Sequence, residues 1–254
     1  MDVTHAIVIL ISAVLAGAVN AVAGGGTLIS YPALIWIGRD PIIANATSTV
    51  ALWPGTLASI FGYRAQLADT RKYLAMFVAP SVLGGALGAF LLLQTPSKLF
   101  AQIVPFLILG ATILRCLNDV IAKWLKQTPD MHRSREWWIG AIIFQFIVGI
   151  YGGYFGAGIG IMMLAAFGLL GMRDIHKMNA LKATCGACMN GVAAAYFIYK
   201  GQVMWGDALI MLMGSIAGGY GGASMAQKLG RKFTNGAVIV IGLVMGLYLL
   251  VKAF

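Results

Sequence analysis

The chain has 254 residues, of which 60% are hydrophobic and only 10% are charged, and its formal net charge is +10. An ordinary soluble domain carries about 25% charged residues, so this composition, with a mean hydropathy of +0.86, excludes one. The 33 glycines and the long apolar blocks indicate an all-α polytopic membrane protein, in which small residues let helices approach closely. We expect a single membrane domain over residues 1–254.

Ten apolar segments are predicted, five in each half of the chain. They cover residues 5–23, 26–37, 42–62, 73–93 and 99–117, then 138–155, 159–171, 180–199, 205–226 and 235–253. A helix needs about 20 apolar residues to cross the hydrocarbon core, and the second segment of each half is shorter than that. It is either a half-length helix that meets another at a glycine break or the short arm of a hairpin. Both alternatives return the chain to the side from which it came.

The two halves repeat each other. Asn45-Ala46 recurs as Asn179-Ala180 and Ser81 recurs as Ser215, each at a shift of 134 positions. Each half makes a net odd number of crossings, so the two repeats must be inverted. Inverted repeats are typical of secondary transporters, whose site lies between the repeats near the bilayer midplane. We assign 1–118 to the first repeat, 119–136 to a cytoplasmic linker and 137–254 to the second repeat.

The basic residues predict the orientation. If the loop after the third segment is cytoplasmic, thirteen Lys and Arg residues lie on that side and four on the other. This distribution satisfies the positive-inside rule and places both termini on the periplasmic side of an inner membrane. The positive charge is therefore loop charge at the surface of a lipid bilayer, and we expect no nucleic-acid partner.

Glycine clusters interrupt the apolar run between the first two segments of each half. The first cluster is Gly24-Gly25-Gly26, followed by Thr27, and the second includes Gly156-Ala157-Gly158. A helix that restarts after such a break has about four N–H groups without an intrahelical partner and the positive end of its dipole. An anion is a natural partner for them. The alternative is close helix packing, to which we assign Gly84, Gly85, Gly88 and the glycines of 218–222.

Polar residues open the third segment of each half. Asn45, Thr47 and Ser48 in the first half, and Asn179 and Thr184 in the second, supply hydrogen-bonding groups without a buried charge. For the two asparagines, helix N-capping is an equal alternative.

Lys182 aligns with Ser48 at the shift of 134 positions. A lysine at mid-membrane costs about 2.5–3.5 kcal/mol. We predict that it points inward, where it would attract an anion, rather than outward as a cytoplasmic anchor.

Carboxylates are scarce. None lies in the middle of an apolar segment, so a carboxylate-based cation or proton pathway has no obvious residue. Asp40 and Asp174 each follow an arginine, and we expect local pairing. Cys185 and Cys188 form a C-x-x-C on an apolar helix without a histidine pair, which favours helix packing. We expect no catalytic residues, no cofactor and no metal, and hence no enzyme.

The residues from Val19 to Thr27, then Pro32 and Asn45-Ala46-Thr47-Ser48, resemble the TauE/SafE family of sulfite and organosulfonate exporters. The second-half copy, from Gly153 to Gly158 and then Asn179-Ala180 and Thr184, supports the resemblance, which covers essentially the whole chain. It implies an inner-membrane transporter of sulfur-containing anions such as sulfite or sulfoacetate. One departure is Leu181, which stands where the first half has Thr47.

The residues and the resemblance together predict a secondary transporter for small sulfur-containing anions that works by alternating access of two inverted repeats. The alternatives are an importer of the same anions, an anion channel, and a membrane enzyme or its partner subunit; a homodimer is one alternative for the oligomeric state. The candidate substrate-binding residues are Asn20, Gly24, Gly25, Gly26, Thr27, Asn45, Thr47, Ser48, Gly156, Ala157, Gly158, Asn179, Lys182 and Thr184.

Overall fold

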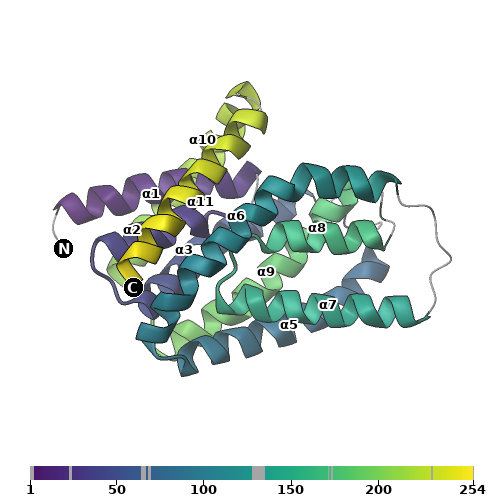
Figure 1. The fold of residues 1–254 in the computed structure, drawn as a ribbon, viewed down its shortest axis with the longest axis horizontal. Helices are drawn as coiled ribbons and strands as arrows, with labels where there is room; N and C mark the ends of the chain where they lie inside the picture. Colours follow the sequence, from purple (N-terminus) through teal and green to yellow (C-terminus); the bar gives the residue numbers. More distant parts are fainter. Residues whose placement is uncertain are drawn as a thin grey trace.

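The computed structural model describes residues 3–22, 25–63, 67, 70–127, 135–170, 172, 174–229 and 231–253, and the regular structure in these residues is α-helical (Figure 1). The first half contains α1 (Val3–Val22), α2 (Thr27–Trp36), α3 (Pro41–Gly62), α5 (Arg71–Gln94) and α6 (Ser97–Gln127). The second half contains α7 (Arg135–Tyr154), α8 (Ile159–Leu169), α9 (Ile175–Tyr199), α10 (Trp205–Leu229) and α11 (Arg231–Ala253). Each predicted segment corresponds to one helix, which confirms the all-α polytopic fold.

The lengths of α1 and α2 decide between the two alternatives for the short segments. In the part of the chain that the structure describes, α1, α5, α6 and α7 are long and apolar enough to cross a membrane. In contrast, α2 has 10 residues and α8 has 11. At 1.5 Å per residue these are about 15 Å long, half of the hydrocarbon thickness. Each half therefore begins with a hairpin that has one full-length arm and one short arm.

The two halves interlock. The first helix of each half packs along the fourth helix of the other, α1 on α10 and α7 on α5. In the same way α2 contacts α11 and α8 contacts α6, while α3 lies against α9 and α6 against α11. Exchanging the two halves reproduces each of these six helix pairs. The internal repeat of the sequence is thus a repeat of the fold.

Glycines make the close helix pairs possible. A Cβ on Gly84 would collide with the backbone oxygen of Phe146, and one on Gly88 with that of Ile150, where α5 crosses α7. The equivalent contact between α1 and α10 depends on Gly218, whose Cβ would collide with the backbone oxygen of Val14. The packing role predicted for these glycines is confirmed.

Asp40 and Asp174 cap the helices that follow them. The Oδ1 of Asp40 accepts hydrogen bonds from the N–H groups of Ile42 and Ile43 at 2.9 and 3.3 Å. Asp174 does the same for residues 176 and 177 at the start of α9. The expected pairing of Asp40 with Arg39 is wrong, because Arg39 binds a distant aspartate instead; Arg173 lies outside the described residues.

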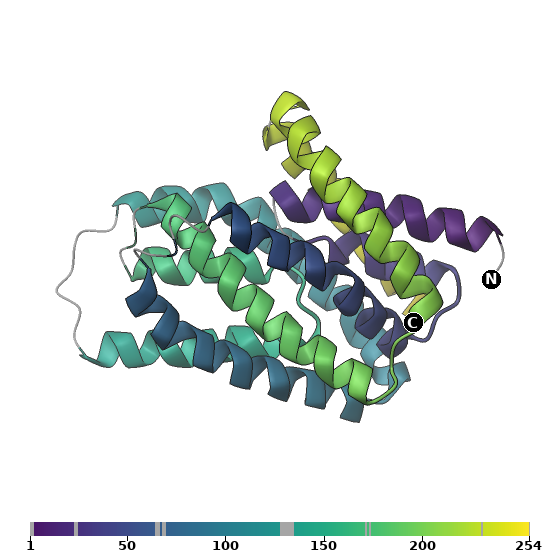
Figure 2. The same cartoon turned by 180° about the vertical axis from the view of Figure 1, so that it is seen from behind.

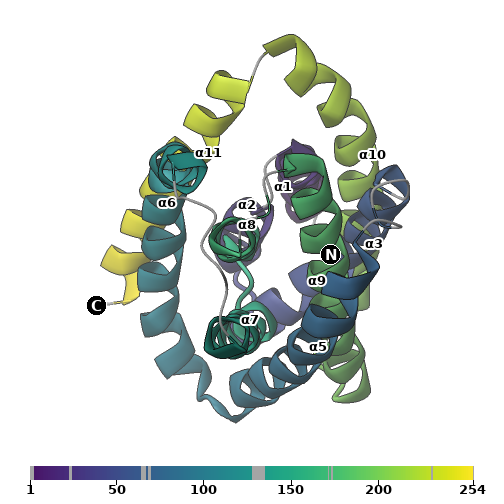
Figure 3. The same ribbon diagram turned by 90° about the vertical axis from the view of Figure 1, so that its right-hand side faces the viewer.

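The half-length helices α2 and α8 lie inside the bundle, one behind the other along its long axis, with the longer helices around them (Figure 3). The two termini lie at one end of the molecule, whereas α6 ends and α7 begins at the other end (Figures 1 and 2). The helix α6 continues to Gln127 and α7 begins at Arg135, so most of the predicted linker 119–136 is helical.

Candidate functional site

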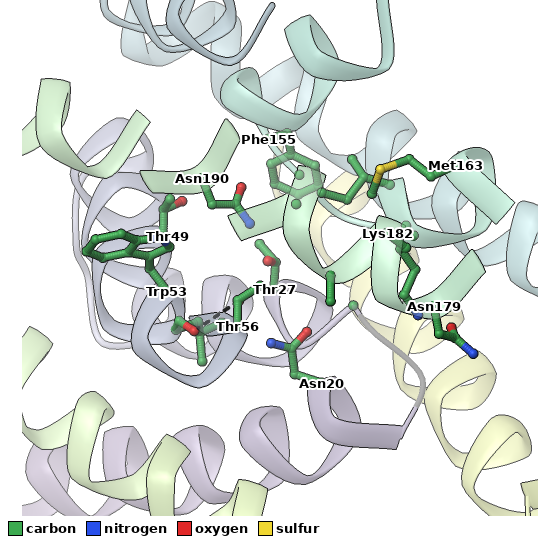
Figure 4. A pocket seen from close by; sticks show the side chains of 18 of the residues that line it. Asn20, Thr27, Thr49, Trp53, Thr56, Phe155, Met163, Asn179, Lys182 and Asn190 are labelled. Atoms are coloured by element: carbon green, nitrogen blue, oxygen red, sulfur yellow. Dashed lines mark hydrogen bonds between the residues drawn. The ribbon is translucent and has the colours of Figure 1, made fainter. Parts of the chain in front are cut away.

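A polar cavity of about 170 Å³ lies where the two glycine breaks meet inside the bundle (Figure 4). Residues from α2, α3, α8 and α9 line it, together with Asn20 at the end of α1. The end of α3, at Tyr63, and the start of α9, at Asn179, both reach this cavity. Because α3 and α9 are equivalent helices, they run in opposite directions past the same site, as inverted repeats require.

One face of α3 and one face of α9 form opposite walls of the cavity. From α3 come Thr49, Leu52, Trp53 and Thr56, and from α9 come Asn179, Lys182, Ala183, Gly186 and Asn190. Counted from the first member, the others follow at positions +3, +4 and +7, and in α9 also at +11, which is the spacing of a single helix face. The α9 wall therefore consists of polar and small side chains, whereas the α3 wall combines two threonines with the larger side chains of Leu52 and Trp53.

The N-termini of α2 and α8 point into this cavity. Gly25 and Thr27 line it from the first break, and Gly156, Gly158, Ile159 and Gly160 line it from the second. The first-turn N–H groups of a helix have no intrahelical partner and carry the positive end of the helix dipole. Two such ends thus meet at one site, where neither is capped by a side chain.

Backbone conformation explains the glycines at these breaks. Gly25 has φ of 100°, Gly156 of 82° and Gly158 of 78°, all in the left-handed region. That region costs other residues about 1–2 kcal/mol. In the second break, the Tyr151 hydroxyl donates a hydrogen bond of 2.7 Å to the backbone oxygen of Ala157, which ties the turn to α7.

Lys182 lines the cavity, so its side chain takes the inward direction (Figure 4). Its stem lies beside Gly160 at the start of α8, where an added Cβ would come within 3.1 Å of the lysine Cδ. The absence of a side chain at this glycine therefore leaves room for the lysine. Among the described lining residues, Lys182 is the one charged side chain and none is a carboxylate.

Three predicted site residues in the first half lie away from the cavity. Asn45, Thr47 and Ser48 are at most 1% exposed, and each is used in a packed interface. The Asn45 amide donates to the backbone oxygen of Tyr154 at 3.1 Å, and the hydroxyl of Thr47 accepts from the Met204 N–H at 3.1 Å. Ser48 shares a hydrogen bond of 2.6 Å with Ser30.

The remaining predicted residues divide between the cavity and its supports. Asn179 lines the cavity from within α9, and since Asp40 and Asp174 are the caps, the capping alternative for Asn45 and Asn179 is wrong. Gly26 packs against α1, Ala157 is buried, and the Thr184 hydroxyl donates to the Ala180 backbone oxygen. Leu181 is buried in the core, and Gly24 lies outside the described residues.

The interpretation of the sequence did not include Thr49, Trp53, Thr56 and Asn190, which the structure brings to the cavity. Two of them carry a signal in the repeat, because Thr56 and Asn190 are equivalent at the shift of 134 positions. The indole N–H of Trp53 donates to the backbone oxygen of Ala187, its own equivalent position, at 2.9 Å. The axis that relates the halves therefore passes close to this bond.

The donor set suits an anion rather than a cation or a metal. Asn20, Asn179 and Asn190 offer amide groups, Lys182 offers a positive charge, and the helix starts offer backbone N–H groups. Within the described residues, no three or more His, Cys, Asp and Glu side chains come together to hold a metal ion.

A bundle of interlocked helical repeats with a polar cavity between two glycine-broken hairpins defines a membrane transporter. The chain belongs to the sulfite exporter TauE/SafE family, whose model matches residues 9–249. The predicted family is thereby confirmed.

Relatives with similar sequences are named as transporters. A "probable membrane transporter protein" of Haemophilus influenzae is 30% identical over 236 residues, which cover 89% of this chain and 87% of the relative. The "probable membrane transporter protein YfcA" of Escherichia coli strain K12 is 28% identical and covers 96% of this chain and 88% of its own. A "probable membrane transporter protein ORF9" of a Sinorhizobium species is 25% identical, with 95% and 91% covered. No solved structure matches the chain.

Proposed function

We propose that this protein is a secondary transporter that moves small sulfur-containing anions, such as sulfite or organosulfonates, across the bacterial inner membrane. The observation that carries the proposal is the meeting of two helix N-termini and Lys182 in one cavity whose described lining contains no carboxylate. Backbone N–H groups and helix dipoles bind oxyanions at helix starts elsewhere. A low-dielectric interior strengthens these interactions, and no carboxylate among the described lining residues repels an anion.

The size of the cavity supports a small anion. Its volume of about 170 Å³ is several times the share of one water molecule in the liquid, about 30 Å³. An anion that carries one sulfur group and a few further heavy atoms fits such a space together with a few waters. The family name supports sulfite, and the apolar part of the wall, from Leu52, Phe155 and Met163, would accept a short organic group.

The cavity faces one side of the molecule. A larger hollow of about 730 Å³ between α1, α3 and α10 shares Asn20, Leu52 and Tyr63 with it, at the end of α3. This is the side on which the basic loops place the cytoplasm, with both termini in the periplasm. We propose that the structure is the inward-facing state of an alternating-access cycle.

A thermal-shift screen of the purified protein tests the site. The ligands are sulfite, thiosulfate, sulfoacetate, taurine, sulfate and small carboxylates. An anion at one hundred times its Kd should stabilise the folded state by about 2.7 kcal/mol. The shift should be lost in Lys182→Met and kept in Lys98→Met, which removes the same charge from an exposed position at the start of α6. If Lys182→Met kept the full shift, the assignment of the site would be wrong.

Transport in proteoliposomes separates the alternatives. Counterflow of labelled sulfite or sulfonate that saturates with concentration indicates a carrier, whereas linear flux without exchange indicates an anion channel. Vesicles of known orientation, with and without a proton gradient, distinguish export from import.

A further inference from the structure

A bidentate ion pair lies at the end of the molecule opposite the side that we propose the cavity faces. The Nε of Arg39 donates to Oδ2 of Asp207 at 2.6 Å, and its Nη2 donates to Oδ1 at 3.0 Å. Arg39 lies in the turn between α2 and α3, and Asp207 lies in the first turn of α10. The pair thus joins the first repeat to the second. Asp207 is 2% exposed and Arg39 is 26% exposed.

Two further layers lie between this ion pair and the cavity. The first is the hydrogen bond from the Met204 N–H to Thr47, which again joins α3 to the residues just before α10. The second is a cluster of buried rings, in which Tyr31 meets Phe155 and Phe100 edge to face, with ring centroids 5.6 and 6.2 Å apart. Phe155 also lines the cavity, so the ring cluster is the wall that closes it on this side.

At the shift of 134 positions, the sequence repeats one partner of the ion pair and not the other. Arg39-Asp40 recurs as Arg173-Asp174 at the shift of 134 positions, and both aspartates are helix caps. At the same shift, the first residue of α10, Trp205, aligns with the first residue of α5, Arg71. Asp207 then aligns with Tyr73. The arginine is repeated but its carboxylate partner is not.

We propose that Arg39 and Asp207 form a one-sided latch that keeps the transporter closed at the end that holds both termini. The proposal rests on the alternating-access function proposed above. In the opposite state of the cycle, the other end of the molecule would be closed by the equivalent contacts of the exchanged halves. Tyr73 then stands at the position of Asp207, so that closure has a tyrosine in place of the carboxylate. The latch therefore favours the state seen here, and its opening is a cost that transport must overcome in each cycle.

Asp207→Asn is the sharper perturbation of the latch. Removing the carboxylate of Asp207 leaves the charge of Arg39, whose side chain reaches water. Removing Arg39 would instead leave the buried carboxylate of Asp207 without its partner. An uncompensated buried charge destabilises the whole fold, so its effect would not report on the latch alone.

The test uses cysteine labelling from either side of the membrane. In a background with Cys116, Cys185 and Cys188 changed to alanine, the reporter Asn45→Cys lies behind the latch and its repeat equivalent Asn179→Cys lines the open cavity. A membrane-impermeant maleimide is added to right-side-out and inside-out vesicles. We expect Asp207→Asn to raise the labelling rate of Asn45→Cys from the terminal side about tenfold, a shift of about 1.4 kcal/mol. Labelling of Asn179→Cys from the other side should fall.

Asp40→Asn is the matched control, because it removes the neighbouring carboxylate that caps α3 and does not bind Arg39. Unchanged labelling in Asp207→Asn, or an equal rise in Asp40→Asn, would overturn the latch. If Asp207→Asn does not fold, the double variant Arg39→Asp with Asp207→Arg decides, because restored slow labelling supports the latch and fast labelling refutes it. Absence of any anion-induced thermal shift in the unchanged protein is a separate result, which would overturn the proposed function and leave the labelling outcome readable.

Discussion

Replacing Gly158 by alanine should weaken anion binding by moving the start of α8. The backbone at this position has φ of 78°, and a Cβ there would lie 3.1 Å from the Cβ of Ala111 in α6. The left-handed conformation costs alanine about 1–2 kcal/mol. The tight contact must also be relieved by a shift of a few tenths of an ångström between α6 and α8. Because first-turn N–H groups of α8 line the cavity, both effects act on the anion-binding end of this helix.

Gly201 provides a matched control for this change. It has φ of 67°, but an added Cβ would meet nothing within 4 Å, and the residue lies between α9 and α10, away from the cavity. Both alanine variants should therefore lose about 1–2 kcal/mol of stability, which lowers the Tm by roughly 2–8 °C in a chain of this size. Only Gly158→Ala should also bind the anion about tenfold more weakly, a loss of about 1.4 kcal/mol.

The assay combines thermal unfolding of the detergent-solubilised protein with calorimetric titration of the anion that gives the largest thermal shift. If both variants lose a similar amount of Tm but only Gly158→Ala loses affinity for the anion, the result would support a site at the α8 N-terminus. Parent-like affinity in Gly158→Ala, or the same loss of affinity in Gly201→Ala, would refute the reasoning, because the left-handed strain would then not act through the site.

Three further predictions concern packing, the cavity wall and the asymmetry between the halves. Gly88→Ala should lower the Tm by several degrees, because the new Cβ would collide with the backbone of α7; Gly110→Ala, with open space around it, should not. Asn190→Ala should weaken anion binding roughly 10- to 150-fold in the same titration, since a hydrogen bond to a charged ligand contributes about 1.5–3 kcal/mol. Ser48→Lys should abolish the monodisperse peak in size-exclusion chromatography, because Ser48 is fully buried, whereas Lys182→Ser at the equivalent position should keep it. Equal behaviour of the last two variants would contradict the asymmetry of the site.

The interlocked arrangement has a consequence for movement. The first helix of each half packs against the other half. The tight pairs α1 with α10 and α5 with α7 therefore form two units, and each unit contains helices from both repeats. The helix α3 packs on α10 and α9 packs on α5, so each unit gains one of these helices. The two units then meet where α3 lies against α9, and the Trp53 indole donates a hydrogen bond to the backbone oxygen of Ala187. For the proposed alternating-access movement, we therefore expect contacts along α3 and α9 to change while the glycine-packed pairs stay together.

The sequence by itself determined the helices, the repeat and the family. Helix positions follow from local apolar runs and their polar ends, and all ten segments correspond to helices in the structure. The glycine breaks could also be predicted, because the left-handed turns at Gly25, Gly156 and Gly158 need a residue without a Cβ. Such features depend on residues that are only a few positions apart in the chain, so they can be predicted directly from the sequence.

The tertiary structure decided which polar residues share a space. Ser48 and Lys182 are equivalent in the repeat, yet Ser48 is buried against Ser30 whereas Lys182 lines the cavity. Arg39 binds Asp207, 168 positions away, instead of the aspartate beside it, because the neighbouring carboxylate already accepts the free N–H groups of α3. These outcomes depend on how two interlocked halves pack, and a hydropathy pattern specifies the buried face of a helix without specifying its partner.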